Sequence, residues 1–381
     1  FRGVFVNSEE LEQQVLQWFE HFHQYPEISW KEFKTTEKIA QILASNEVSY
    51  RLFDGIPGLV AEIGSGEEVI AMRADIDALW QEVNGEMRAN HSCGHDANIT
   101  MVLGALLNLK EFQLKKRIRF IFQPAEESGG GALETMKQNV LENVNYLFGV
   151  HLRPIEELPL GKITPAIHHG AAVFLKGKIR GIDAHGARPH QGRNAIDVLV
   201  AIHQFINSIH IDPFEACSLK MTRMQADGGS INIIPGNAEF SMDIRAQKNE
   251  VLKQLIEKVE HGIKMISTMY NIEISLEWYD RTPGAVVHPD AAKIAELSII
   301  EALGVDALAP EIHTPGSDDF PYYTVMNPEL KAAMIGVGAD LAPGLHHPLM
   351  TFNKQALFDG IKVITTTLKN AANVPNIQQK G

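Results

Sequence analysis

The sequence predicts a two-domain α/β protein in which a smaller α+β domain is inserted into a larger sheet domain. Near both ends of the chain, short apolar runs alternate with segments of helical periodicity, which is typical of a largely parallel sheet covered by helices. Between them the order changes to strand, helix, strand, strand, helix and strand. The chain has 381 residues, enough for two ordinary domains.

The sheet domain is expected to comprise residues 1–171 and 284–381. Its first helix is predicted from apolar residues at helical spacing between Leu11 and Phe22, with Asn7 as a candidate N-cap. Further helices are expected near 32–45, 97–112, 131–141 and 289–303, and from Asn353 onward. Strands are expected at GLVAEIG, VIAMR, IRFIF, YLFGV and AAMIGVG.

Residues 172–283 are expected to form the inserted domain. Its predicted strands are AVFLKGKIRG, CSLKMTRMQA, NAEFSMDIRA and NIEISLEWY, with helices at 193–210 and 248–269. This β-α-β-β-α-β order is that of a ferredoxin-like domain. The last two strands alternate between apolar and polar residues, which indicates that helices cover one face of their sheet.

Composition narrows the classes of partner. The 47 acidic residues outnumber the 34 basic ones, for a formal charge of -13, and no run of Lys and Arg mixed with aromatic residues occurs. Nucleic acid is therefore not an expected partner. The two cysteines, Cys93 and Cys217, cannot build a disulfide framework, and no apolar stretch approaches the ~18 residues of a membrane span. We expect a protein of the reducing cytoplasm with no membrane partner.

Polar residues follow three of the expected strands at the point where each strand ends. They are Asp75 and Asp77 after VIAMR, Gln123, Glu126 and Glu127 after IRFIF, and His151 after YLFGV. In open α/β sheets, ligands bind beyond the carboxyl ends of the strands, so these side chains are expected to converge on one crevice. Cys93 and His95 precede a predicted helix and could join them.

Each of these residues also has a plainer interpretation when it is taken alone. Asp96 could cap the helix that follows it, and adjacent Glu residues are usually a solvated surface. A single His at a strand end is more often a hydrogen-bonded structural residue than a ligand. The coincidence of several such residues at one sheet edge favours a site.

A thiolate, imidazoles and a carboxylate together suit a borderline divalent metal such as zinc, manganese, cobalt or nickel. Metal binding also deprotonates a thiol, so Cys93 becomes an anion able to bridge two ions. Adjacent Glu side chains cannot both point at one atom from an extended loop. One of the pair Glu126 and Glu127 could therefore bind metal while the other acts as a general base.

Eight motifs occur in order along the chain: MRADIDAL, HSCGHD, FQPAEE, GVH, AHGARPH, NIIPG, DIRAQ and LHHPLMTFN. Together they resemble the amidohydrolase branch of the M20 metallopeptidases, which includes aminoacylases, hippurate hydrolases and auxin-conjugate hydrolases, and they look similar to bacterial amidohydrolases of the AmhX type. The resemblance implies a zinc-peptidase-like catalytic domain with two divalent metal ions and an inserted lid domain that dimerises. It also implies hydrolysis of the amide bond of N-acyl amino acids by a metal-activated water.

Carried over by position, the resemblance implies a role for each residue of the expected crevice. These roles are Cys93 as bridging ligand, His95 and His151 as ligands that complete one ion, Glu127 as a ligand, His346 as a ligand of the other ion, and Glu126 as general base. Only one of the pair His346 and His347 should bind metal, and His347 is the alternative.

The sequence departs from the family pattern at three positions. Asn98 stands where many relatives have a His, and we expect this position to lie outside the metal ligands. Asp318 in PGSDDF is a shorter acid than the Glu that relatives often carry, and it could reshape the substrate entrance. Arg73 stands where other M20 branches carry a metal-binding His, which suggests that His95 supplies that ligand instead.

Three residues of the inserted domain are further candidates. The resemblance assigns His185 to the active site of the other subunit, where it would steady the oxyanion of the tetrahedral intermediate; a loop His bonded within its own domain and His190 are the alternatives. Arg245 could clamp the carboxylate of the product amino acid, with Asn232 nearby as a polar anchor, and a surface ion pair is the alternative. An edge strand, ending near Gln225 or formed by AVFLKGKI, could pair with its twin in a homodimer.

Three other functions stay open. A Cys93 nucleophile would leave the carboxylate pair without a role, and His95 is too local in sequence to be the usual remote base. A dipeptidase or carboxypeptidase could use the same metal site. A binding protein on this scaffold would have lost catalysis, although every expected ligand and the base are present.

Overall fold

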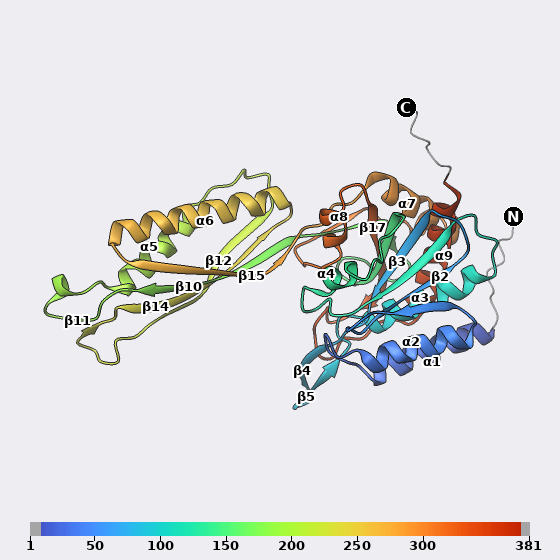
Figure 1. Ribbon diagram of the computed structural model, residues 1–381, viewed down its shortest axis with the longest axis horizontal. Helices are drawn as coiled ribbons and strands as arrows, with labels where there is room; N and C mark the ends of the chain where they lie inside the picture. The colour runs from blue at the N-terminus through green and yellow to red at the C-terminus, as the bar shows by residue number, and fades with distance from the viewer. Residues whose placement is uncertain (1–8, 375–381) are drawn as a thin grey trace. The chain divides into compact units, whose positions relative to one another are not determined.

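The computed structural model describes residues 9–374, which form two compact units (Figure 1). Unit 1 contains the described residues up to His168, Val286–Ile312 and the described residues from Asp319 onward. Unit 2 contains His169–Ala285 and His313–Asp318. The sequence analysis placed 313–318 in the larger domain, whereas these residues group with unit 2. The expected Asn7 cap lies outside the described residues.

Within the described residues, unit 1 is built on a seven-stranded sheet in the order β1-β2-β6-β3-β7-β17-β8. The strands are β1 (Ser49–Leu52), β2 (Leu59–Ile63), β3 (Val69–Asp75), β6 (Arg117–Gln123), β7 (Val144–Pro154), β8 (Ile163–Thr164) and β17 (Lys331–Leu341). The central strands β6, β3, β7 and β17 are parallel, as predicted, whereas β1, β2 and β8 are antiparallel to their neighbours. A short connection such as the one between β1 and β2 leaves no room for a crossover, so those strands run antiparallel.

Helices cover both faces of this sheet. On one face, helices pack against alternate residues of the strands and form one apolar core with them. These helices are α1 (Glu9–Gln24), α2 (Phe33–Ser45), α3 (His95–Lys110), α7 (Pro289–Leu303) and α9 (Gln355–Asn373). On the other face, the intervening strand residues pack with α4 (Gly131–Met136) and α8 (Pro321–Met326). Along β3, Ile70 and Met72 belong to the first core and Ala71 to the second, as the two-residue period of a strand requires.

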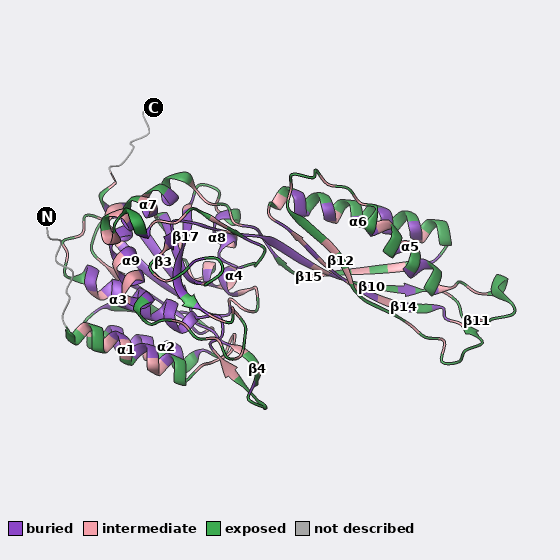
Figure 2. Ribbon diagram, turned by 180° about the vertical axis from the view of Figure 1, so that it is seen from behind, coloured by how far each residue is buried: buried purple, intermediate pink, exposed green. Residues whose placement is uncertain are grey.

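Helix α3 is buried on nearly all sides (Figure 2). Apolar residues therefore surround it rather than forming one stripe, which explains the run MVLGALL in the sequence. The helix begins at His95, earlier than predicted, so His95 stands in its first turn. Helix α4 ends at Met136, short of the predicted 141, and the chain continues in tighter turns in which Gln138 N donates to the Thr135 carbonyl at 3.0 Å. Among residues 9–374, no helix is long and apolar enough to span a bilayer.

A hairpin of β4 (Leu79–Val83) and β5 (Glu86–Asn90) follows β3 and was not predicted. Its turn residues Asn84 and Gly85 both have positive φ, 54° and 87°. Asn-Gly is the preferred pair for a two-residue hairpin turn, so the signal was present in the sequence. The unpredicted strands β9 (Ile167–His169) and β16 (Ile312–Thr314) pair where the chain passes between the units.

Unit 2 has the predicted ferredoxin-like topology. The strands β10 (Ala171–Arg180), β12 (Cys217–Ala226), β14 (Asn237–Ala246) and β15 (Glu273–Thr282) form an antiparallel sheet in the order β12-β14-β10-β15. One face is covered by α5 (Ala195–Asn207) and α6 (Asn249–Tyr270), and alternate residues of β14 are buried there. The short strands β11 (Ala184–His185) and β13 (Ile233–Ile234) pair beside one end of this sheet, near the end of β10 and the start of β14.

The strand order identifies the edges of the unit 2 sheet. Strands β12 and β15 each have one neighbour in this sheet and are its edges. Strand β10 pairs with β14 on one side and with β15 on the other. The expectation that AVFLKGKI forms an edge is therefore wrong, because the backbone of that strand is already hydrogen-bonded on both sides. The strand that ends near Gln225 is an edge strand.

We predict that Gly177→Ala destabilises unit 2. Gly177 pairs with Phe240 across β10 and β14, and a Cβ at Gly177 would lie 2.0 Å from Cζ of the Phe240 ring. Displacing the ring should lower the free energy of unfolding by about 1–3 kcal/mol, measured by urea denaturation. Gly316→Ala is the control, because its Cβ would meet only Thr314 Oγ1 at 3.5 Å. Equal stability of the two variants would contradict the packing argument.

Candidate metal centre

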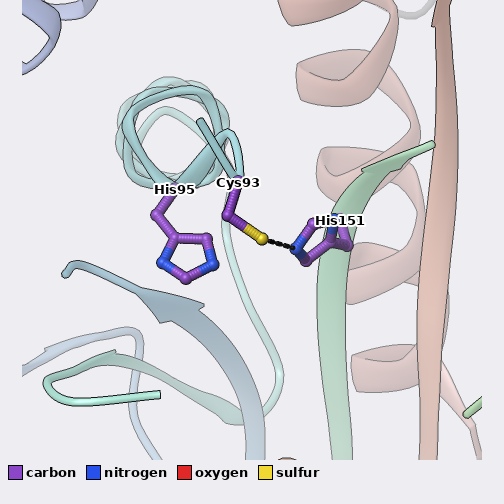
Figure 3. Close-up of side chains that lie close together, drawn as sticks. All are labelled: Cys93, His95 and His151. Atoms are coloured by element: carbon purple, nitrogen blue, oxygen red, sulfur yellow. Dashed lines mark hydrogen bonds between the residues drawn. The ribbon is translucent and has the colours of Figure 1, made fainter. Parts of the chain in front are cut away.

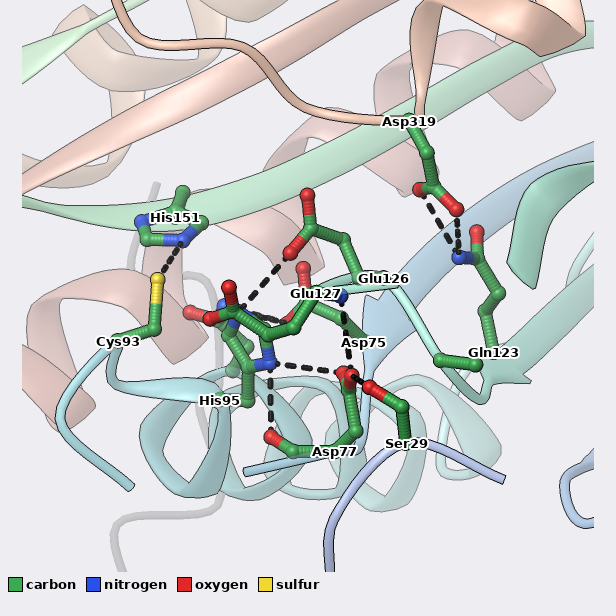
Figure 4. A network of polar contacts seen from close by, with 12 residues as sticks. Ser29, Asp75, Asp77, Cys93, His95, Gln123, Glu126, Glu127, His151 and Asp319 are labelled. Carbon is green, nitrogen blue, oxygen red and sulfur yellow. Dashed lines mark hydrogen bonds and ion pairs between the residues drawn. The ribbon is translucent and has the colours of Figure 1, made fainter. Parts of the chain in front are cut away.

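Chemically active side chains of unit 1 gather at the carboxyl ends of its central strands (Figure 4). Strand β7 carries His151, and the loop after β6 carries Glu126 and Glu127. Cys93 precedes α3, and His95 is the first residue of that helix. Between them, Gly94 has φ 87°, a left-handed conformation that favours glycine. The backbone thereby delivers a thiol and an imidazole from two positions separated by a single glycine to the same edge of the sheet.

The structure groups six of the predicted site residues by their ligand atoms. Within each group, one ligand atom per residue lies within 4.8 Å of the others; the groups are Cys93 with His95 and His151, Cys93 with Glu127 and His346, and His95 with Glu126 and Glu127. Cys93 Sγ lies 3.5 Å from His151 Nε2 (Figure 3). Because the first two groups share Cys93, the arrangement has the form of two adjoining cation sites joined by one sulfur.

Two polar atoms at the centre of these groups are buried and have no hydrogen-bond partner among the described residues. They are His95 Nε2 and Glu127 Oε1, 3.9 Å apart. His346 Nε2 lies 3.4 Å from the same Glu127 oxygen. Leaving a buried polar atom without a partner costs about 1–3 kcal/mol. A cation bound between these atoms would remove that cost, because both atoms could then act as its ligands. The donor set of thiolate, imidazole and carboxylate suits a borderline divalent metal.

The outer nitrogens of two imidazoles are held by hydrogen bonds. His95 Nδ1 donates to Asp77 through the main-chain oxygen at 2.9 Å and Oδ1 at 3.1 Å. His151 Nδ1 donates to the Leu152 carbonyl at 2.7 Å. In each ring, Nε2 is then directed into the cluster, which is the usual way in which outer contacts orient a metal-binding His.

The loop after β17 distinguishes His346 from its neighbour. His346 has φ 65°, its N–H donates to the Ser92 carbonyl at 2.8 Å, and its ring faces Glu127. His347 instead accepts a hydrogen bond from Leu349 N at 3.1 Å, within its own loop. The geometry therefore favours His346 as the metal ligand of the pair.

The electrostatics of the cluster favour a cation. Burial and the Glu127 carboxylate raise the pKa of the Cys93 thiol well above its usual value. Burial alone would lower the pKa of His95, but Asp75 and Cys93 raise it well above its ordinary value. The His95 shift reflects the negative charge around its ring, whereas burial is the larger cause of the Cys93 shift. A divalent ion would reverse the thiol shift and release the Cys93 proton on binding.

A buried network that the sequence analysis did not find supports this cluster. Arg73 forms an ion pair with Asp75, donates from Nε to Gln123 Oε1 at 2.9 Å, and donates from Nη2 to Asp319 Oδ1 at 2.7 Å. Asp319 also accepts from Ala132 N at 2.7 Å. Arg73 thus occupies a charge-balancing position and binds no metal. No local signal in the sequence links Asp319 to a residue 246 positions earlier.

Asn98 and Asp96 have structural partners. Asn98 is buried, donates to Asp75 Oδ1 at 2.7 Å, and belongs to none of the ligand groups of the described residues. Asp96 accepts from Ala97 N at 2.8 Å, as a residue in a first helical turn can, and from His23 Nδ1 at 2.7 Å. Asn98 therefore supports a carboxylate rather than replacing a ligand.

The three candidates of the inserted domain lie at two opposite ends of the unit 2 sheet. His185 is exposed in β11, and the Asn232 carbonyl accepts from Gly186 N at 2.7 Å, so these two residues are neighbours. Arg245 stands near the far end of β14, about 26 Å along that strand from Asn237. The expectation that Asn232 lies near Arg245 is therefore wrong within one chain.

Arg245 has its own partners in unit 2. Its Nε donates to Asp243 Oδ1 at 2.9 Å, its Nη1 donates to the Pro315 carbonyl at 3.4 Å, and its guanidinium lies over the Phe174 ring at 6.0 Å. The ion pair that was the alternative for Arg245 is thus present. The Arg245 side chain is still about one-third exposed (36%).

The sequence model of peptidase family M20/M25/M40 matches residues 71–370. The N-acetyl-L-cysteine deacetylase of Bacillus subtilis (strain 168) is 31% identical over 379 residues, covering 92% of this chain and 86% of the relative. An IAA-amino acid hydrolase of Arabidopsis thaliana is 29% identical over 325 residues, covering 79% and 72%. The crystal structure of a Bacillus subtilis dinuclear metal binding peptidase of the M20 family superposes with a TM-score of 0.78 at 25% identity, over 95% of this chain and 98% of the other.

We predict that Cys93→Ala loses metal. Because Cys93 belongs to two ligand groups, its removal should weaken zinc or manganese binding by at least about 100-fold. The metal content of protein reconstituted with each ion and then desalted measures this. Cys217→Ala is the control, since Cys217 is exposed in unit 2, and it should retain the parental metal content. Undiminished metal in Cys93→Ala would contradict the site.

Proposed function

Because the chain belongs to peptidase family M20/M25/M40 and is an amidohydrolase, we propose that it hydrolyses the amide bond of N-acyl amino acids with two divalent metal ions. The observation that carries the proposal is the convergence of Cys93, His95, Glu127, His151 and His346 around one edge of the sheet, with Glu126 beside them. In this proposal, the Cys93 thiol would be a ligand shared by both ions.

The relatives support the substrate class. Their names describe a deacetylase of N-acetyl-L-cysteine and a hydrolase of IAA-amino acids. Each name describes a substrate in which an acyl group is attached to an amino acid, and this shared feature is the basis of the proposal. A panel of N-acetyl, N-benzoyl and indole-acetyl amino acids, with dipeptides as the competing class, tests it. Faster turnover of dipeptides than of every N-acyl amino acid would reassign the enzyme as a dipeptidase.

The candidate site residues of unit 1 would act either as metal ligands or as the general base. Cys93, His95, His151, Glu127 and His346 would hold the ions. The chemistry that divalent ions supply when bound there is Lewis acidity, which polarises a carbonyl and lowers the pKa of water. Glu126, whose Oε2 lies 3.8 Å from His95 Nε2, is placed beside the ligands and is our candidate base.

Glu126 would move one proton during hydrolysis. Its carboxylate accepts a proton from the attacking water as the new C–O bond forms at the amide carbonyl. The C–N bond then breaks, and the protonated Glu126 delivers that proton to the leaving amine nitrogen. The carboxyl returns to its ionised form, and the products are a carboxylate and an amino acid.

We further propose that the active site is completed in a homodimer. Among residues 9–374, strand β12 pairs with one neighbour only, so two copies could join their unit 2 sheets through its other edge. His185 and Asn232 lie at the opposite end of the sheet from Arg245. One chain therefore cannot bring all three to a single substrate through unit 2 alone. In the dimer, the partner subunit's His185 would donate to the oxyanion, and Arg245 would bind the substrate carboxylate.

Glu126→Ala should retain bound metal and lose turnover. Removing a general base typically lowers kcat by about 10²-fold to 10⁴-fold, while the ligands of the ions stay in place. Metal content and kcat on an N-acyl amino acid are measured on the same preparation. Glu134→Ala, which removes an exposed carboxylate of α4, is the control and should keep the parental kcat. Parental turnover by Glu126→Ala would remove Glu126 from catalysis.

Mixing two inactive variants should restore activity if the site is shared. After subunit exchange between His185→Ala and Glu126→Ala, each hybrid dimer has one site with both original residues. Random exchange would recover up to about a quarter of the parental activity. A mixture of Glu126→Ala with the double variant lacking both residues is the control, because none of its dimers has a complete site. No recovery despite proven exchange would place His185 outside the partner's site.

A further inference from the structure

The segment 27–32, EISWKE, connects α1 to α2 and packs against the loop that carries Glu126. We call this segment the N-terminal clamp. At its start, the Glu27 carbonyl accepts from Ala78 N at 2.8 Å, and Ser29 Oγ donates to Asp77 Oδ2 at 2.7 Å. In its middle, Trp30 has φ 67°, and its Cζ2 atom would lie 3.7 Å from a Cβ on Gly130. The clamp thus contacts both the segment that follows β3 and the loop that follows β6.

The last clamp residue, Glu32, reaches the backbone next to Glu126. The Glu32 side chain is fully buried, and its Oε1 accepts from Ala125 N at 2.7 Å. Ala125 has φ 56°, a left-handed conformation that is disfavoured for a residue with a Cβ. The hydrogen bond therefore holds a backbone conformation that Ala125 would otherwise tend to leave.

The other side of Glu126 is held in the same way. Asp77 Oδ2 accepts from Glu127 N at 3.0 Å, and the same oxygen is bound by Ser29 of the clamp. The Ala125 carbonyl accepts from Gly131 N at 3.1 Å, which closes the loop behind Glu126. Side-chain carboxyl groups thus bind the N–H groups of both residues that flank Glu126.

Burying Glu32 costs free energy, and the hydrogen bond that its Oε1 accepts from Ala125 N is the interaction that an apolar residue could not replace. Its other oxygen, Oε2, is buried and has no hydrogen-bond partner among the described residues. Burial and the nearby Asp77 carboxylate raise the pKa of Glu32 to about 8, so the carboxyl is largely protonated at neutral pH. An apolar residue would avoid both costs but could not bind Ala125 N. What the position requires is an acceptor at that distance rather than a negative charge.

We propose that Glu32 is a positioning residue that holds the backbone of residues 125–127 so that the Glu126 carboxylate points at the reacting atoms. This proposal rests on the proposed function of Glu126 as general base. Within residues 9–374, Glu32 forms no hydrogen bond or ion pair with a candidate metal ligand, so it acts through the loop. Small displacements of a catalytic group can lower kcat by about 100-fold, which makes such a hydrogen bond worth keeping.

Three substitutions separate the acceptor from the charge. Glu32→Gln keeps an acceptor oxygen of the same reach and should retain a kcat close to that of the parent. Glu32→Asp keeps the carboxyl but shortens the side chain by about 1.5 Å, and Glu32→Leu removes the acceptor altogether. Both should lower kcat by about 10-fold to 100-fold while KM and metal content stay close to the parent.

Amide hydrogen exchange of the metal-free protein gives a readout that does not depend on activity. The amides of Ala125 and Glu127 should exchange faster in Glu32→Asp and Glu32→Leu than in the parent, and at the parental rate in Glu32→Gln. Glu27→Ala is the matched control. Glu27 is the other carboxylate of the clamp, and its Oε2 binds Thr35 N at 2.8 Å rather than the loop. This variant should lose thermal stability but keep the parental exchange of the loop.

The outcomes distinguish the two proposals. If Glu32→Gln loses as much kcat as Glu32→Leu, an acceptor oxygen of the same reach does not suffice, and the positioning role is overturned. Equal effects of Glu27→Ala and Glu32→Asp on loop exchange would reduce Glu32 to a general stabiliser and overturn it as well. If the parent hydrolyses no N-acyl amino acid, the proposed function fails, but the exchange rates still decide whether Glu32 holds the loop. Should Glu32→Leu not fold, the Gln and Asp variants carry the test.

Discussion

Buried negative charge at the carboxyl edge of the unit 1 sheet is the constraint on which the rest of the structure depends. Asp75 and Asp77 are fully buried there, next to a thiol and the Glu126–Glu127 pair. Arg73 offsets part of this charge through its ion pairs with Asp75 and Asp319, and the Asp75 carboxylate raises the pKa of the nearby His95 imidazole. Divalent ions held by the candidate ligands would offset more of this charge, and folding of the crevice would then depend on metal binding.

The need to hold this buried charge explains why residues from distant parts of the chain contribute to one small site. Parallel strands place several polar residues at one edge because all their carboxyl ends point the same way. Each ligand then needs an outer contact to hold its direction, which Asp77 supplies to His95 and a main-chain carbonyl supplies to His151. The N-terminal clamp supplies outer contacts of the same kind to the loop that carries the proposed base, Glu126. It braces a loop whose backbone is strained at Ala125.

The inserted unit poses a different problem. Its sheet buries one face against two helices and leaves β12 as an edge. The chemically interesting residues lie at opposite ends of that sheet, because a ten-residue strand separates Asn232 from the end at which Arg245 stands. A site that uses all of them through unit 2 requires a second copy of the chain. The length of strand β14 is therefore the reason that the proposed use of His185, Asn232 and Arg245 at one site involves two subunits.

Strand and helix periodicity determined the α/β class and the ferredoxin-like insert, because alternation and helical spacing are local properties of the sequence. The motifs likewise predicted which residues meet at the crevice, since strand ends position them. Tertiary structure alone decided the rest. It paired Arg73 with Asp319, bound Glu32 to Ala125, moved AVFLKGKI to the sheet interior and separated Asn232 from Arg245. These outcomes depend on contacts between residues remote in sequence, and such contacts leave no periodic signal in the chain.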